Sequence, residues 1–184
     1  VGPVVGGAGK FIATYDNSDL TYLGSAVDGP ANIARTMEVA PDGLSIYWTM
    51  FTGAMGIDIY TRPDELSSFV LADSVFRGMS IETAAWNPAT GNLWVSNDSR
   101  GTNKSYTHLT WYGLDVTTKT IVGSFTLPKD AAPADELPRG LAFSNDGMTA
   151  YVGLFGTKYD RIYKFTKSPS SVIFTDDFES GSAN

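Results

Sequence analysis

Residues 82–98 read ETAAWNPATGNLWVSND, which is a short apolar segment, a tight turn and a second, aromatic-rich segment. The same arrangement occurs upstream in residues 35–48, RTMEVAPDGLSIYW, and downstream in residues 139–152, RGLAFSNDGMTAYV. Each copy places Pro, Asn, Asp or Gly between apolar segments, and this pattern is typical of a β-hairpin. The chain is therefore predicted to be a repeat protein built on hairpins.

Further short apolar segments follow each hairpin, so each repeat is predicted to contain about four strands. Equivalent turn positions lie 47 residues apart from Pro41 to Pro88 (88 − 41), and 57 apart from Pro88 to Asn145 (145 − 88). The longer spacing accommodates the proline-rich residues 128–138, which are predicted to be a loop. A single helical turn at most is predicted for residues 63–66. The predicted organisation is a lead-in with a two-stranded half blade over 1–32, repeats over 33–80, 81–128 and 137–175, and an acidic tail over 176–184.

Two segments carry a family resemblance, residues 87–95, NPATGNLWV, and residues 137–147, LPRGLAFSNDG. They resemble the β-propellers of the NHL, YVTN and SMP-30-like type, and the likeness extends over about residues 33–175. The resemblance implies an all-β fold, a β-propeller-like array of four-stranded antiparallel blades. Closed propellers have about 4–8 blades, whereas this chain supplies about three and a half. The ring is therefore predicted not to be closed by this chain alone.

The composition favours an extracellular or cell-surface protein. The 184 residues carry a formal net charge of −7, which argues against nucleic acid as a partner because phosphate contacts need clustered Lys and Arg. No apolar run approaches the roughly 20 residues of a membrane-spanning helix. The sequence has no cysteine, which excludes disulfides and thiolate chemistry. Asn97 and Asn103 match the glycosylation sequon.

Arg35, Glu82 and Arg139 occupy equivalent positions in the three repeats, just ahead of the innermost strand. The propeller resemblance places this position at the mouth of a central channel, where ligands bind. These residues are therefore candidates either for binding an anionic ligand or for charge pairing between neighbouring blades, and the pairing is favoured.

The resemblance to SMP-30-like lactonases also implies a divalent metal held by Glu, Asn and Asp. Glu82, Asn97 and Asp98 are the matching candidates, with the hard oxygen ligands that Ca²⁺ prefers. The ligand set is incomplete, and Asn and Asp are common in turns for backbone reasons. No cofactor is therefore expected, and Ca²⁺ is the alternative.

No residue is assigned a catalytic role. His108 is the only histidine, so multi-histidine metal sites are excluded and a catalytic triad would depend on this residue. The four tryptophans lie on predicted strands, where packing between blades is favoured over stacking against sugar rings. They are Trp48, Trp86, Trp94 and Trp111.

The expected function is that of an extracellular structural or interaction protein that assembles with other copies of itself into a fibre or larger oligomer. Unpaired sheet edges at the two ends of the array invite strand addition between subunits. The expected interface residues are Phe11, Tyr15, Val172, Phe174 and Phe178. Two alternatives stay open, namely a fragment of a ligand-binding or lactone-hydrolase-like propeller enzyme and a module that binds carbohydrate.

Overall fold

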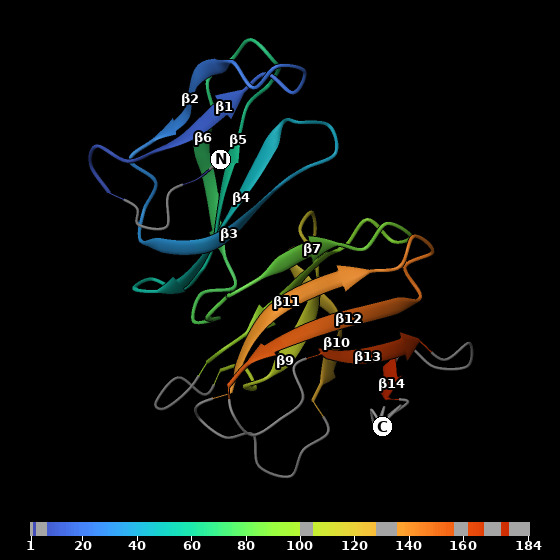
Figure 1. The fold of residues 1–184 in the computed structure, drawn as a ribbon. Coiled ribbons are helices and arrows are strands. Elements are labelled where there is room, and N and C mark those ends of the chain that lie inside the picture. Colours follow the sequence, from blue (N-terminus) through green and yellow to red (C-terminus); the bar gives the residue numbers. More distant parts are fainter. Residues whose placement is uncertain are drawn as a thin grey trace. The chain divides into compact units, whose positions relative to one another are not determined.

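The computed structural model describes residues 2, 7–99, 105–127, 136–156 and 162–167, and the backbone of residues 174–176. Within these residues the chain forms fourteen β-strands and no helix, so the all-β prediction is confirmed (Figure 1). The strands form four antiparallel sheets, one of two strands and three of four strands, as expected for a propeller-like array. No described segment is a helix with the length and hydropathy needed to cross a membrane.

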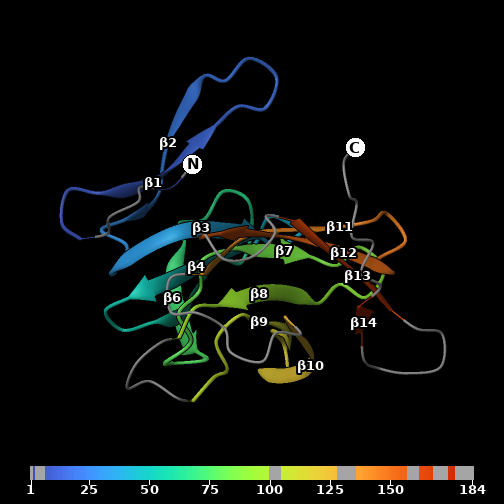
Figure 2. The ribbon, with the colours of Figure 1, turned by 60° about the horizontal axis from the view of Figure 1, so that its bottom comes forward.

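Each sheet is formed by strands that are consecutive in the chain, and Figure 2 shows the same strands from a second direction. The two-stranded sheet contains β1 (Phe11–Tyr15) and β2 (Tyr22–Asp28). The first four-stranded sheet contains β3 (Ile33–Val39), β4 (Ser45–Thr52), β5 (Gly56–Thr61) and β6 (Val70–Val75). The second contains β7 (Ala84–Trp86), β8 (Leu93–Asn97), β9 (Thr110–Asp115) and β10 (Thr120–Thr126). The third contains β11 (Leu137–Phe143), β12 (Thr149–Phe155), β13 (Ile162–Lys167) and β14 (Phe174–Asp176).

Side chains in the three hairpin turns bind backbone amides, which explains why the same residue types recur there. Asp42 and Asp146 each accept a hydrogen bond from the amide two residues later, and Asn87 accepts from two amides of its own turn. Gly43 and Gly147 have φ angles of 71° and 67°, a conformation that favours glycine. The turns predicted from Asp, Asn and Gly in the sequence are therefore present, and these residues stabilise them.

One local prediction is consistent with the structure, and one needs correction. Residues 63–66 form a turn in which the Asp64 carboxylate accepts a hydrogen bond from the Leu66 amide, and no helical turn forms. The predicted loop 128–138 includes Pro138, which instead lies in β11 opposite Leu154. Because β11 is an edge strand, one of its sides forms no inter-strand hydrogen bonds, and edge strands are where sheets tolerate proline.

The chain divides into two compact units, Val1–Ala84 and Ala85–Asn184. In the first unit, Ile12 of β1 and Val27 of β2 are buried in one cluster with Trp48 and Met50 of β4. The Trp48 indole also donates a hydrogen bond to the carbonyl of Ala31. The two-stranded sheet is therefore anchored on the apolar side chains of the first four-stranded sheet.

Aromatic rings form the core of the second unit. The Trp111 and Phe125 rings stack with their centres 5.4 Å apart, and Phe125 lies 4.6 Å from Phe165. Trp94 stacks on the other side of the same group, 5.4 Å from Phe125. Three of the four tryptophans are thus buried, as packing predicts, whereas Trp86 is only partly buried.

Gly113 lets the Trp94 indole lie across the second four-stranded sheet. Gly113 stands opposite Trp94 on the neighbouring strand, and Gly123 stands opposite Gly113 on the next. A Cβ atom at position 113 would lie 2.7 Å from the indole, whereas one at position 123 would lie 3.5 Å away, an ordinary contact. The shape of this core therefore depends on the absence of a side chain at position 113.

The middle strands differ in how many faces they bury. In β4 and β8, consecutive residues are buried, so both faces of the strand are covered. In β12, Ala150, Val152 and Leu154 are buried while Tyr151 and Phe155 are exposed. The third four-stranded sheet therefore has one covered face and one bare face.

We predict that Gly113→Ala lowers the free energy of unfolding by about 1–3 kcal/mol, because the new methyl group must displace Trp94. The matched control Gly123→Ala is expected to change it by less than about 1 kcal/mol, because its methyl group meets no short contact. Urea unfolding followed by tryptophan fluorescence measures both. Equal losses in the two variants would contradict the described packing of Trp94.

Candidate functional site

Two of the three candidate channel-mouth residues form an ion pair in the first unit. Arg35 lies in β3 and Glu82 lies just ahead of β7, and the distance from Nε to Oε2 is 2.7 Å. The contact lacks the alignment of a hydrogen bond and is ionic in character. The Glu82 side chain is 2% exposed and that of Arg35 is 43% exposed. The guanidinium also lies 4.3 Å from the centre of the Phe51 ring, a cation–π distance.

Arg139, the third candidate, lies in β11 of the second unit. Its guanidinium donates a hydrogen bond to the carbonyl of Pro138 and lies 6.0 Å from the centre of the Phe155 ring. The structure therefore brings Arg35 and Glu82 together and gives Arg139 separate neighbours within its own sheet.

Asp58 is a buried carboxylate that sequence analysis missed. Its Oδ1 atom accepts hydrogen bonds from the Ser74 hydroxyl at 2.6 Å and from the Arg77 guanidinium at 2.7 Å. The signal was present in the sequence of β5, where a single acidic residue stands between two isoleucines. An ionised group in a buried strand needs a cationic or hydrogen-bonding partner, and Arg77 provides it.

Residues at the end of β8 contact the residues that immediately precede β9. Asp98 Oδ1 lies 3.0 Å from His108 Nε2, and both side chains are largely buried. The Asn97 amide donates to the carbonyl of Thr107 at 2.7 Å, while its oxygen accepts hydrogen bonds from Ser99. These contacts join the start and the end of the loop, so each group has a structural role.

Protein groups already contact the oxygen atoms of all three proposed metal ligands, Glu82, Asn97 and Asp98. Among the residues that the structure describes, no group of three or more His, Cys, Asp or Glu side chains could hold a metal ion. Neither observation tests metal binding in solution. Both the expectation of no cofactor and the Ca²⁺ alternative therefore stay predictions.

One of the two glycosylation sequons lies at an asparagine that the structure describes. Asn97 is fully buried, and its amide nitrogen, the atom that would carry a glycan, is hydrogen-bonded to Thr107. A glycan at Asn97 would displace this bond from the folded core. Asn103 lies outside the described residues.

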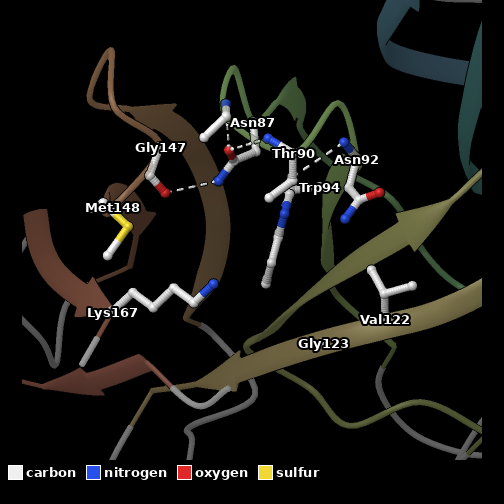
Figure 3. Close-up of a pocket in the computed structure, with 10 residues that line it drawn as sticks. Asn87, Thr90, Asn92, Trp94, Val122, Gly123, Gly147, Met148 and Lys167 are labelled. Atoms are coloured by element: carbon white, nitrogen blue, oxygen red, sulfur yellow. Dashed lines mark hydrogen bonds between the residues drawn. The ribbon is translucent and has the colours of Figure 1, made fainter. Parts of the chain in front are cut away.

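A hollow of about 160 Å³ opens in the second unit beside Trp94 (Figure 3). At its rim, the Asn87 amide donates a hydrogen bond of 2.9 Å to the carbonyl of Gly147 and so joins two hairpin turns. The side chain of Lys167, at the end of β13, extends toward the hollow, and Asn92 lies at its other side. Sequence analysis missed this site, because no local motif predicts which residues from three strands and two turns meet.

The bare face of the third four-stranded sheet is named the outer face and is defined by five side chains. Tyr151 is 45% exposed, Phe155 65% and Ile162 71%. Lys164 stands opposite Tyr151, and Arg139 lies against Phe155. The residues of β12 are nearly all apolar, so the sequence does not reveal which of its faces is bare.

The predicted interface residues are only partly within the described chain. Phe11 and Tyr15 of β1 are each 44% exposed. Phe174 lies in β14, the edge strand that pairs with β13. Val172 and Phe178 lie outside the described residues.

Comparison with known proteins supports the fold and leaves the function open. No protein-family model matches the chain, and no curated protein matches it. Among solved structures, the chain is similar to the crystal structure of a protein from Lactobacillus plantarum, a structural genomics target, with a TM-score of 0.64 and 14% sequence identity. The match covers 91% of this chain and 50% of that one, so this chain spans half the length of its structural neighbour. At this identity the similarity shows the fold alone.

We predict that Arg35→Met lowers the free energy of unfolding by about 1–3 kcal/mol, because the buried Glu82 carboxylate loses its counter-charge. Adding Glu82→Gln is expected to restore part of this loss, because the amide removes the buried charge at nearly the same volume. Denaturant unfolding of the single and double variants provides the measurement. If the double variant is less stable than Arg35→Met, the prediction that Arg35 stabilises the buried charge of Glu82 is wrong.

Proposed function

We propose that this chain is an extracellular structural or interaction protein that assembles with other copies of itself through the two unlike ends of its propeller-like array. Among propeller-like folds, we assign it to the NHL, YVTN and SMP-30-like type on the strength of residues 87–95 and 137–147. The observation that carries the proposal is the outer face, where apolar side chains are bare. The middle strands β4 and β8 of the other four-stranded sheets are covered on both faces.

Covering the outer face would release hydrophobic free energy. Tyr151, Phe155 and Ile162 are large apolar side chains with 45%, 65% and 71% of their surface exposed. Burial of apolar surface stabilises an association by roughly 25 cal/mol for each Å² removed from water. A contiguous exposed group of this kind on a sheet is typical of a face that receives another sheet.

The sheet of β1 and β2 has exposed aromatic side chains that could pack against the apolar side chains of the outer face. Its inner end is anchored by Ile12 and Val27, which are buried. Toward its other end, the rings of Tyr15 and Tyr22 contact each other with their centres 5.5 Å apart, and both are exposed. A sheet of only two strands is marginal in water and is stabilised by further strands or by packing.

Charge complementarity favours a contact between these unlike ends. The turn after β1 carries Asp16 and Asp19, whose pKa values are lowered by hydrogen bonds from a serine hydroxyl and from a backbone amide respectively. These carboxylates are therefore ionised at neutral pH. The outer face carries Arg139 and Lys164. Opposite charges on the two surfaces favour head-to-tail association over contact between like ends, and head-to-tail contacts produce filaments or rings.

We expect the chain to form oligomers in light scattering, and the double variant Phe155→Ser/Ile162→Ser to shift the population toward monomer at least tenfold. The physical reason is the loss of apolar surface at the outer face. Leu66→Ser is the matched control, because Leu66 is a fully exposed apolar residue elsewhere in the chain. High salt is expected to weaken association, because it screens the charges of the two ends.

Two outcomes would contradict this proposal. One is a chain that stays monomeric at high concentration and low salt. The other is an equal loss of assembly in the Leu66→Ser control, which would indicate non-specific association. Point substitutions are preferred to deletion of residues 1–28, because deletion removes Ile12 and Val27 from the core around Trp48.

The lactone-hydrolase-like enzyme is the alternative, and it requires a metal at Glu82, Asn97 and Asp98. Stoichiometric Ca²⁺ binding measured by calorimetry, and lost in Glu82→Gln, would support the alternative. The absence of heat on Ca²⁺ addition would favour the structural protein.

A further inference from the structure

The hollow beside Trp94 contains a cation that has no acidic partner in the part of the chain that the structure describes. Lys167 lies at the end of β13, two residues after the buried Phe165, so both residues are on the covered face of the sheet. The Lys167 side chain extends toward the hollow (Figure 3). No described residue forms a hydrogen bond or an ion pair with its ammonium group, and none of the described residues that line the hollow is acidic. In a chain with a net charge of −7, this is a local site for a negative group.

Polar groups face the cation from the second repeat. Thr90 and Asn92 line the hollow at the turn between β7 and β8. The Asn87 amide is already engaged with Gly147 and holds this turn in place. The Asn92 side chain has no hydrogen bond to the described residues, so both its amide donor and its carbonyl acceptor are open to a ligand.

The remaining wall is apolar and rigid. Trp94 is held between Phe125 on its own sheet and Phe143, whose ring centre lies 5.8 Å away in an edge-on arrangement. Val122 and Gly123 of β10 continue this wall. An apolar wall opposite a cation and amide groups suits a ligand with C–H groups on one side and charged or hydroxyl groups on the other.

The size of the hollow limits the ligand. Its volume of about 160 Å³ is below the roughly 300–1,000 Å³ of pockets that hold drug-sized molecules. One sugar ring or a small organic acid is therefore the appropriate scale.

We infer that this hollow is a binding site for a carboxylate-bearing sugar unit, of the uronic acid class. The carboxylate binds the Lys167 ammonium group through a charge-assisted hydrogen bond. The ring hydroxyls bind Asn92 and Thr90, and the C–H face of the ring packs against Trp94 and Val122. This site lies on the covered face of the third four-stranded sheet, so it is independent of the outer face and of the proposed assembly.

The test is a titration of the ¹⁵N-labelled Phe155→Ser/Ile162→Ser variant, which is expected to be monomeric and keeps every residue of the hollow, with D-galacturonate and with neutral D-galactose as the matched sugar, followed by chemical-shift changes in NMR spectra. We expect galacturonate to shift the resonances of Asn92 and of the Trp94 indole, and galactose to bind at least tenfold more weakly. Lys167→Met is expected to reduce the affinity for galacturonate at least tenfold. Lys164→Met is the control, because Lys164 lies on the same strand but on the outer face.

A second variant tests the shape of the site without removing a charge. Gly123→Ala adds a methyl group to the wall of the hollow at ordinary contact distance from Trp94, so the fold is retained while the space decreases. We expect it to weaken galacturonate binding. Equal binding of the two sugars, equal effects of Lys164→Met and Lys167→Met, or no shift at tens of millimolar galacturonate would each overturn the proposal.

Discussion

A sheet that is apolar on both faces must be covered on both faces, and the rest of this chain's architecture depends on that constraint. The strands β4 and β8 have side chains that are buried at successive positions, which is possible only when each face has a neighbour. The third four-stranded sheet meets the constraint on one face and leaves Tyr151, Phe155 and Ile162 exposed on the other. The two-stranded sheet of β1 and β2 likewise has an anchored inner end and exposed aromatic rings. Both features are uncovered apolar surfaces of described strands, and the proposed assembly rests on them.

Sequence reasoning predicted the strands well because turn chemistry in this chain is local. Asp42, Asn87 and Asp146 bind amides within their own turns, so each hairpin is specified by a few consecutive residues. The position of Pro138 was predicted less well. The sequence shows that a proline disfavours a strand, but an edge strand tolerates it, and edges are a property of the whole sheet.

The candidate sites were harder to predict, because they depend on contacts between distant residues. Arg35 and Glu82 were identified as candidates because they occupy equivalent positions in two repeats, and in the structure they form an ion pair. The same alignment could not assign a partner to Arg139. The hollow beside Trp94 combines residues from turns and strands about 80 positions apart, and its Lys167 is an ordinary strand-end lysine in the sequence.

The hydrogen bond from Asn87 to Gly147 has a consequence for how the second unit forms during synthesis. Its two ends are separated by 60 residues, so the link between the two turns forms only after position 147 has left the ribosome. Until then, the Asn87 amide is solvated and Trp94 lacks the ring of Phe143. Contacts of such long sequence separation form late, because the entropy of closing the intervening loop is lost before they contribute. The growing chain therefore passes through a period in which the second repeat is translated but still lacks its contacts with Phe143 and Gly147.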